Sequence, residues 1–387
     1  MKYKYRLDKR WARVFVRFRS LMWYRKRSDT VNLQACKSVA LVYPHLIGDI
    51  VMVTPFLRLL RRVAPQAEIT FIGAGWAKQI LDNQHLTDKF ICFQNPRAML
   101  GMRAVLENYK DVWQTLQTAR QQKFDAVIEP FGDVTATLFA SFLRADEYIG
   151  VDFSNLSKLQ TYTAPYDADA HLVDGLLKLF ESCGVRLQPE DYFPQIVLSE
   201  RQRQVRQDFV EQHRLAGKTV IGIHPGASVD SRRWKGFAHL INSLCESRCD
   251  MAICLFCGPG DENFVQDILA QVNVEFKERV ITVKRPLSEY MAVLSVCSHV
   301  ICNDSSCGHI TAALGVPVTV LFAQGEPRFI APRGPNTVNI ISRDFPCKPC
   351  VQNECPKHTH ECFTWITPEI VFETVQNALN GDLRKIC

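Results

Sequence analysis

The strongest constraint on the fold is an alternation of short apolar runs with helical patterns that occurs twice along the chain. Short apolar runs between helical patterns predict buried strands joined by helical crossovers, the arrangement of a parallel α/β sheet. The first series predicts strands at 39–43, 69–72 and 126–129 and a helix at 50–63. The second predicts strands at 220–224, 251–256, 280–281, 300–302 and 316–322 and helices at 236–244, 287–295 and 308–314.

A polar, proline-containing stretch at 188–194 separates the two series and predicts a linker. The 387 residues suit two domains that each bury a core of their own. We therefore expect an N-terminal Rossmann-like domain at 31–195 and a C-terminal Rossmann-like domain at 215–387, with a cleft between the two halves. Ligands of open α/β sheets bind beyond the carboxyl ends of the strands, so the loops that follow the predicted strands are the place to look for a site.

Positive charge is concentrated at the N-terminus. Residues 1–29 hold eleven Lys and Arg against two Asp, whereas the rest of the chain holds 35 basic and 38 acidic residues. Apolar side chains recur there at helical spacing, at Trp11, Val14, Phe15, Phe18 and Met22. Basic side chains lie roughly opposite, at Arg6, Lys9, Arg10, Arg13 and Arg17. This pattern predicts a basic amphipathic arm over residues 1–30 that binds an anionic membrane surface through residues 1–29.

The arm has other interpretations. It could be a solvated helix that packs on the body of the protein. Nucleic acid is not an expected partner, because no nucleic-acid-binding motif accompanies the basic residues. Arginines interrupt each apolar stretch, so we do not expect a signal peptide, and no run reaches the ~18 apolar residues of a membrane-spanning helix.

The chain has fifteen cysteines, and most are expected to be reduced thiols in a cytosol. The exception is a cysteine-rich segment at 347–362, formed by Cys347, Cys350, Cys355 and Cys362. Four thiolates in a short loop can hold tetrahedral zinc or iron, so a structural metal is one interpretation. Free or packed thiols and a redox disulfide are the alternatives.

The stretch V-I-C-N-D-S-S-C-G-H-I-T-A-A at 300–313 is a candidate anion-binding corner. A strand that ends in small residues and opens a helix directs backbone N–H groups and the positive end of the helix dipole at the same point. Asp304 and His309 flank that point, and Ser305 and Ser306 lie between them. A ligand that carries phosphate, such as a nucleotide sugar, would suit this corner.

Three other junctions between a strand and a helix carry candidate residues. Asp49 stands at the first one, either as an N-cap or as a general base. The turn H-P-G-A-S at 224–228 contributes Ser228 and is followed by Arg232, which suits a phosphate oxygen unless the loop is merely solvated. The stretch G-P-G-D-E at 258–262 ends in Glu262, which could accept hydrogen bonds from ribose hydroxyls or belong to an ordinary loop.

Together these segments resemble glycosyltransferase family 9, the ADP-heptose:lipopolysaccharide heptosyltransferases. The resemblance rests on G-D-I-V-M-V-T-P with P-x-A-E-I after it, H-P-G-A-S with R-R-W, G-P-G-D-E, and N-D-S-S-C-G-H-I-T-A-A-L-G-V-P, in that order. It implies a GT-B fold, in which two Rossmann-like domains face each other across a cleft. The N-terminal domain would take the acceptor and the C-terminal domain the nucleotide sugar.

The resemblance also implies roles for the candidate residues. Asp49 falls on the family's proposed catalytic base, and Glu262 on the carboxylate that binds the donor ribose. Arg232 falls where the family has a side chain that touches the donor diphosphate, and Ser228 falls in the phosphate-facing turn. Asp304 and His309 match the family's D-x4-H pair around the donor, and Ser305 and Ser306 supply the anion corner between them. Arg232 stands where the family usually has a lysine, which keeps the charge but changes its reach and geometry, and Ser306 stands where the family usually has a glycine.

The implied activity is inverting, metal-independent transfer of heptose from ADP-heptose to a lipopolysaccharide core acceptor. The enzyme would be cytoplasmic and peripheral to the inner membrane, where the arm could hold it near a lipid-linked saccharide. Alternatives are a family 9 enzyme that uses another nucleotide sugar or a protein acceptor, and a non-catalytic nucleotide-sugar-binding protein. No cofactor is expected for catalysis, with zinc or iron only at the cysteine-rich segment.

Overall fold

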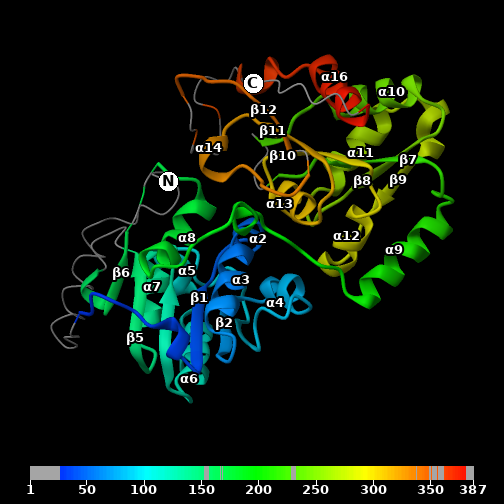
Figure 1. Ribbon diagram of the computed structural model, residues 1–387. Coiled ribbons are helices and arrows are strands. Elements are labelled where there is room, and N and C mark those ends of the chain that lie inside the picture. Colours follow the sequence, from blue (N-terminus) through cyan, green and yellow to red (C-terminus); the bar gives the residue numbers. More distant parts are fainter. Residues whose placement is uncertain are drawn as a thin grey trace. The chain divides into compact units, whose positions relative to one another are not determined.

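The chain folds into two compact units, Met1–Tyr192 and Phe193–Cys387, and each contains one six-stranded sheet. The computed structural model describes residues 27–151, 157–165, 167, 169–227, 232–336, 338–347, 350, 355 and 361–380 (Figure 1). The boundary between the units lies inside the predicted linker at 188–194, next to a short 3-10 helix at Pro189–Tyr192. Residues 1–26, and with them the predicted amphipathic helix, lie outside the described residues.

The first unit is built on a parallel sheet with the strand order β3-β2-β1-β4-β5-β6. The strands are β1 Ser38–Tyr43, β2 Glu68–Ala74, β3 Lys89–Phe93, β4 Phe124–Glu129, β5 Ala145–Val151 and β6 Tyr162–Ala164. The direction of strand addition reverses between β1 and β4. Such a reversal opens a crevice at the carboxyl ends of the two strands, which is where open α/β sheets bind ligands.

Helices α2 Ile47–Met52, α3 Thr54–Val63, α4 Trp76–Leu81, α5 Met102–Glu107, α6 Tyr109–Ala119, α7 Val134–Ser141 and α8 Leu172–Ser182 complete this unit. Side chains of α6 and α7, among them Leu116 and Phe139, form one core with Ala40, Val42 and Ile72 of the sheet. Helices α3 and α8 pack together through the rings of Phe56 and Phe180, whose centroids lie 4.8 Å apart.

The single helix predicted at 50–63 is wrong, because the structure has two helices that meet at Val53. Pro55 lies in the first turn of α3 and has no N–H to donate to the carbonyl of Val51. The Thr54 hydroxyl donates to that carbonyl instead, at 2.8 Å. The break therefore follows from the T-P pair in the sequence.

The second unit repeats the architecture with the order β12-β11-β10-β7-β8-β9, again with every pair parallel. Its strands are β7 Thr219–His224, β8 Met251–Phe256, β9 Val280–Val283, β10 His299–Asn303, β11 Val318–Phe322 and β12 Val338–Ser342. Strand addition reverses between β7 and β10, so this unit has a crevice of the same kind. The predicted parallel α/β fold is confirmed.

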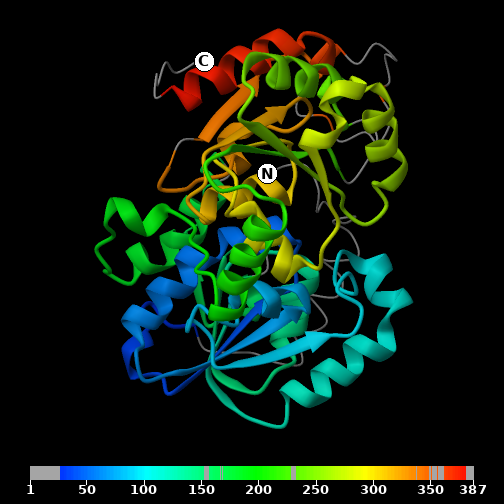
Figure 2. The ribbon, with the colours of Figure 1, turned by 90° about the vertical axis from the view of Figure 1, so that its right-hand side faces the viewer.

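The helices of the second unit are α9 Glu200–Gln212, α10 Phe237–Ser247, α11 Glu262–Gln271, α12 Leu287–Leu294, α13 Ser306–Ala313, α14 Pro327–Ile330, α15 Glu361–Thr364 and α16 Pro368–Leu379. Helix α10 lies beside α11 and α16 (Figure 2). All three helices share a core with Ile221, Ile253 and Ile301 of the sheet. Helix α12 packs against β8 through Tyr290 and Phe256, whose ring centroids lie 5.0 Å apart. Helix α9 lies between the predicted bounds of the two domains and belongs to the second unit.

None of the helices in the described ranges is long and apolar enough to cross a bilayer. All cysteines in these ranges are free thiols.

Candidate functional site

At the crevice of the second unit, the amide of Asn303, the last residue of β10, joins the strand to the loop after β7. Asn303 is fully buried, and its Nδ2 donates to the Pro225 carbonyl at 2.7 Å. Its Oδ1 accepts from the backbone N–H of Trp234 at 3.3 Å. The loop after β7 is thus tied to the end of β10 where the strand order reverses, and the next residue, Asp304, enters the predicted anion corner.

The structure brings Asp304, Ser305, Ser306 and His309 together at the start of α13. Ser305 is the N-cap, Ser306 is the first helical residue, and His309 is buried one turn further on. Within the described part of the chain, the buried Ser305 hydroxyl has no hydrogen-bond partner and makes no capping bond. The backbone N–H groups of the first helical turn are therefore available to an anion at this corner.

Arg232 lies beside the same corner. Its Nε donates to Oε1 of the buried Gln324 at 3.1 Å. The neighbouring Gly325 lies against the Asp304 carboxylate, because a Cβ at Gly325 would be only 2.5 Å from Asp304 Oδ2. Arg232 and Asp304 thus meet the same loop after β11. Ser228, predicted to lie in the phosphate-facing turn, is outside the described residues.

The two acids at 261–262 face different surroundings. Glu262, predicted to bind ribose, is the exposed first residue of α11, and its carboxylate lies 2.8 Å from Lys284 Nζ. The hydrogen bond from Lys284 lowers the pKa of Glu262. Asp261 is buried and pairs with Arg233 Nη2 at 2.6 Å. Burial raises the pKa of Asp261, and the charge of Arg233 opposes that shift.

Asp49 lies in the first unit, at the start of α2 directly after β1. It is the third helical residue, and its Oδ2 accepts from the backbone N–H of Leu46 at 3.2 Å. Leu46 is the N-cap, so the alternative in which Asp49 is the N-cap is wrong, although Asp49 does stabilise this helix end. The side chain is half-buried.

Three further titratable groups surround this end of the first sheet. His45 is buried between the rings of Tyr43 and Phe131, at centroid distances of 4.5 and 4.2 Å. Burial lowers the pKa of His45. The nearby charges of Asp49 and Asp133 oppose that shift. Asp133 caps α7 by accepting from the Ala136 N–H at 2.9 Å.

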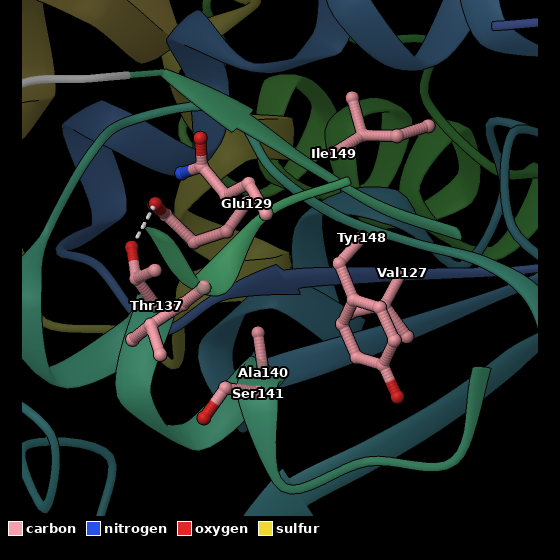
Figure 3. A pocket seen from close by; sticks show the side chains of 9 residues that line it. Val127, Glu129, Thr137, Ala140, Ser141, Tyr148 and Ile149 are labelled. Carbon is pink, nitrogen blue, oxygen red and sulfur yellow. Dashed lines mark hydrogen bonds between the residues drawn. The ribbon is translucent and has the colours of Figure 1, made fainter. Parts of the chain in front are cut away.

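Glu129 ends β4 and is buried. Its carboxylate accepts from Gly132 N–H at 2.9 Å and from the Thr137 hydroxyl at 2.8 Å, beside a cavity of about 10 Å³ (Figure 3). That volume is close to the least that can hold one water molecule. Burial, and secondly the charge of Asp133, raise the pKa of Glu129 to about 8.

Sequence reasoning missed the groups that hold these sites together. Asn303, Asp261 and Arg233 lie inside the motifs N-D-S-S, G-P-G-D-E and R-R-W but received no role of their own, and Gln324 lies in none of the motifs. In the first unit the signal was E-P-F-G-D at 129–133, an acid that ends a buried strand and is followed by a glycine and a second acid.

The cysteine-rich segment is not arranged as a metal site in the described residues. Burial raises the pKa of Cys362 most, and the neighbouring Cys347, Cys355 and Cys350 raise it further, so the four thiols lie near one another. Within the described ranges, however, no three His, Cys, Asp or Glu side chains are grouped closely enough to hold an ion.

Comparison with known proteins connects these features to one family. Residues 112–360, more than half of the chain, match the family described as glycosyltransferase family 9 (heptosyltransferase). Lipooligosaccharide heptosyltransferase 2 of Campylobacter jejuni is 26% identical over 169 residues, which cover 43% of this chain and 52% of that protein. Lipopolysaccharide heptosyltransferase 2 of Escherichia coli K12 is 22% identical over 354 residues, covering 88% of this chain and 98% of that protein. The chain thus spans about half the length of the Campylobacter relative.

Solved structures share the fold. A family 9 glycosyl transferase from Veillonella parvula superposes with a TM-score of 0.72 at 22% identity, covering 92% of this chain and 100% of that one. E. coli heptosyltransferase WaaC with ADP-2-deoxy-2-fluoro heptose gives 0.63 at 16% identity, covering 88% and 99%. The iron-containing dodecameric glycosyltransferase TibC from enterotoxigenic E. coli gives 0.52 at 14% identity, covering 91% and 81%.

Proposed function

The chain belongs to glycosyltransferase family 9 and has the GT-B fold of two Rossmann-like domains, and we propose that it moves heptose from ADP-heptose to a lipopolysaccharide core acceptor. The observation that carries the proposal is the corner at the start of α13. There the N-terminus of α13, Asp304, Ser305 and Arg232 converge at the carboxyl ends of β10 and β11. A nucleoside diphosphate sugar suits such a corner, because helix N–H groups and an arginine can neutralise its two phosphates.

In the proposed reaction, Asp49 removes the proton from an acceptor hydroxyl while the hydroxyl oxygen attacks the anomeric carbon of heptose. The bond from that carbon to the diphosphate oxygen breaks on the opposite face, so the configuration inverts and ADP leaves. Arg232 and the N–H groups at Ser305 and Ser306 stabilise the charge that develops on the diphosphate. Glu262 would accept hydrogen bonds from the donor ribose, and Ser228 and His309 complete the phosphate side.

The position of Asp49 supports its proposed role as the base. It lies at the carboxyl end of β1, where the first sheet has its crevice, and it is only half-buried. Glu129 at the end of β4 is buried and engaged by three donors, so it is the weaker candidate.

The acceptor is proposed to be a lipid-linked saccharide at the cytoplasmic face of the inner membrane, with residues 1–29 holding the enzyme to the anionic surface. This follows from the charge of the arm and from the relatives, which are heptosyltransferases of lipopolysaccharide and lipooligosaccharide.

A structural metal at Cys347, Cys350, Cys355 and Cys362 is a separate part of the proposal. The described thiols do not fit an ion as they stand, although TibC, which shares the fold, contains iron. Elemental analysis of the purified protein decides the point. One zinc or iron per chain that is lost on Cys355→Ser supports the metal, and less than a tenth of an equivalent in wild type excludes it.

The experiment that tests the reaction is ADP release from ADP-heptose in the presence of truncated lipopolysaccharide. ADP-glucose and UDP-glucose serve as alternative donors, since Arg232 and Ser306 depart from the family pattern. Turnover on truncated lipopolysaccharide with ADP-heptose, and with neither of the other two donors, supports the proposal. Turnover with another donor, or with a protein acceptor, moves the enzyme elsewhere in family 9. Donor binding without turnover on any acceptor would favour a non-catalytic nucleotide-sugar-binding protein.

A further inference from the structure

We propose that Asp261 is a positioning residue of the donor site, which holds Arg233 and thereby presents the adjacent Arg232 to the donor phosphates. The inference rests on the proposed function, because it assumes that Arg232 contacts a nucleotide sugar. It concerns a residue that makes no proposed contact with the donor itself.

The first step is that three consecutive residues are anchored to three different loops. Arg232 donates to Gln324 after β11 at 3.1 Å, and Arg233 pairs with Asp261 before α11 at 2.6 Å. The backbone N–H of Trp234 donates to Asn303 at the end of β10 at 3.3 Å. The segment 232–234 therefore takes its orientation from loops that lie 28 to 92 residues away in the sequence.

The second step is that the two arginines have different surroundings. Arg233 is only 20% exposed, and its guanidinium also lies 5.5 Å from the ring centroid of Phe264 on α11. Its charge is thus committed to a carboxylate and an aromatic face inside the unit. Arg232 contacts a neutral amide, so its charge is not matched by that partner. A structural arginine next to a ligand-facing one gives the R-R pair two distinct tasks.

The third step is the space that Asp261 fills. A Cβ at Gly226 would lie 2.1 Å from Asp261 Oδ2, and a Cβ at Gly258 would lie 2.7 Å from the same oxygen. The carboxylate thus packs directly against the H-P-G turn and the G-P-G turn. Only glycine at both positions leaves room for it. Asp261 therefore joins both turns to Arg233, and its loss would release all three.

The test is a double-mutant cycle with Asp261→Asn, Arg233→Gln and the double variant, measured by ADP titration and by donor and acceptor KM. Each single change should weaken ADP binding and raise the donor KM by about 10- to 100-fold, the effect expected when a contact group shifts by about 1 Å. Acceptor KM should stay near the wild-type value. Because both residues act through one ion pair, the double variant should bind ADP no more weakly than the single variant with the lower affinity.

Matched variants separate positioning from general stability. Asp250→Asn breaks a more exposed Arg–Asp pair in the same unit, with Arg248 at 2.9 Å, and should leave ADP binding unchanged. Arg233→Lys keeps the charge opposite Asp261 and should restore most of the affinity. Multiplicative losses in the cycle, or a Asp261→Asn variant that binds ADP as wild type does, would overturn the proposal.

Hydrogen–deuterium exchange provides a measurement that does not depend on the reaction. Amides of 232–236 should exchange faster in Asp261→Asn than in wild type and Asp250→Asn, even if ADP-heptose proves not to be the donor. Absence of turnover in wild type would therefore count against the proposed function alone. Unchanged exchange in Asp261→Asn would count against the positioning role alone.

Discussion

Asp49 and Glu129 are both carboxyl groups at the carboxyl edge of the first sheet, yet their surroundings suit them to different tasks. Asp49 is half-buried, and its carboxylate accepts from the backbone N–H of Leu46. Glu129 is buried and accepts from Phe131, Gly132 and Thr137. A base must reach a substrate proton, whereas a carboxyl held by several donors fixes a loop.

Asp49→Asn should leave ADP affinity within experimental error of wild type and slow ADP release by roughly 10²- to 10⁴-fold, the usual contribution of a general base. Asparagine keeps an oxygen for the Leu46 N–H, so helix α2 should still begin at the same residue. Titration with ADP and initial rates with ADP-heptose measure the two effects. Full turnover by the variant would show that Asp49 is not the base.

Glu129 should make the stability of the protein depend on pH. Its pKa is raised from 4.5 to about 8, so between these values the folded protein keeps a proton that the unfolded chain releases. The free energy of unfolding should therefore fall as pH rises through this window, by as much as a few kcal/mol. The contribution is fully present below about pH 4.5 and absent above about pH 8.

Glu129→Gln stays neutral at every pH, so it should lack this component. Urea unfolding at pH 5.5 and pH 8.5 measures it, with Glu68→Gln on β2, a more exposed carboxyl, as the control. A pH dependence that is equal in Glu129→Gln and wild type would contradict the assignment.

The sequence could indicate residues that share a motif, but not the partners that those residues meet across the fold. Asp304, Ser305, Ser306 and His309 fall at one helix start because they are consecutive or one turn apart. Gln324 meets Arg232 across 92 positions, and that contact depends on how two loops approach each other. The pattern of neighbouring residues carries no information about which loops approach each other in the folded chain.

At the scale of elements, the sequence predicted the central strands except β5 and missed the edge strands except β9. The runs at 39–43 and 251–256 lie in β1 and β8, which are buried almost throughout. Strands β3 and β12, at the edges of the two sheets, are only half-buried, so their sequences K-F-I-C-F and V-N-I-I-S include polar positions. An edge strand has one neighbour and less need for a continuous apolar run.

Gly73 and Gly75, on either side of Ala74, offer a matched test of how closely strands β1 and β2 approach. A Cβ at Gly73 would lie 2.6 Å from the Tyr43 carbonyl oxygen, whereas Gly75 has no atom within 4 Å of its Cβ position among the described residues. Gly73→Ala should lower the free energy of unfolding by about 1–3 kcal/mol. Gly75 has helical backbone angles that alanine adopts readily. Gly75→Ala should therefore leave the free energy of unfolding unchanged or raise it by up to ~1 kcal/mol.

Urea unfolding of the two variants checks this comparison. Equal stability would mean that the backbone of β1 yields at no cost, and the close approach at Gly73 would then have no energetic meaning.

At the scale of the whole molecule, the described residues limit how far the predicted arm can extend along the chain. The Ser28 N–H donates to the Thr161 carbonyl at 2.8 Å, and Arg27 Nη2 donates to the Thr163 hydroxyl at 3.2 Å. Residues 27 and 28 are thus part of the first unit rather than of a separate arm. A deletion that tests the arm should stop at residue 26, which removes ten Lys and Arg and only Asp8.

Deletion of residues 1–26 should abolish co-sedimentation with vesicles that contain anionic phosphatidylglycerol, because each basic residue near such a surface contributes about 1 kcal/mol. Binding by the full chain should weaken as salt increases and should be slight on neutral phosphatidylcholine vesicles. The deleted form should still release ADP with a water-soluble truncated acceptor, since the unit that holds Asp49 keeps its contacts at Ser28. Equal vesicle binding by both forms would contradict the prediction and would show that the folded units, rather than residues 1–26, bind the membrane.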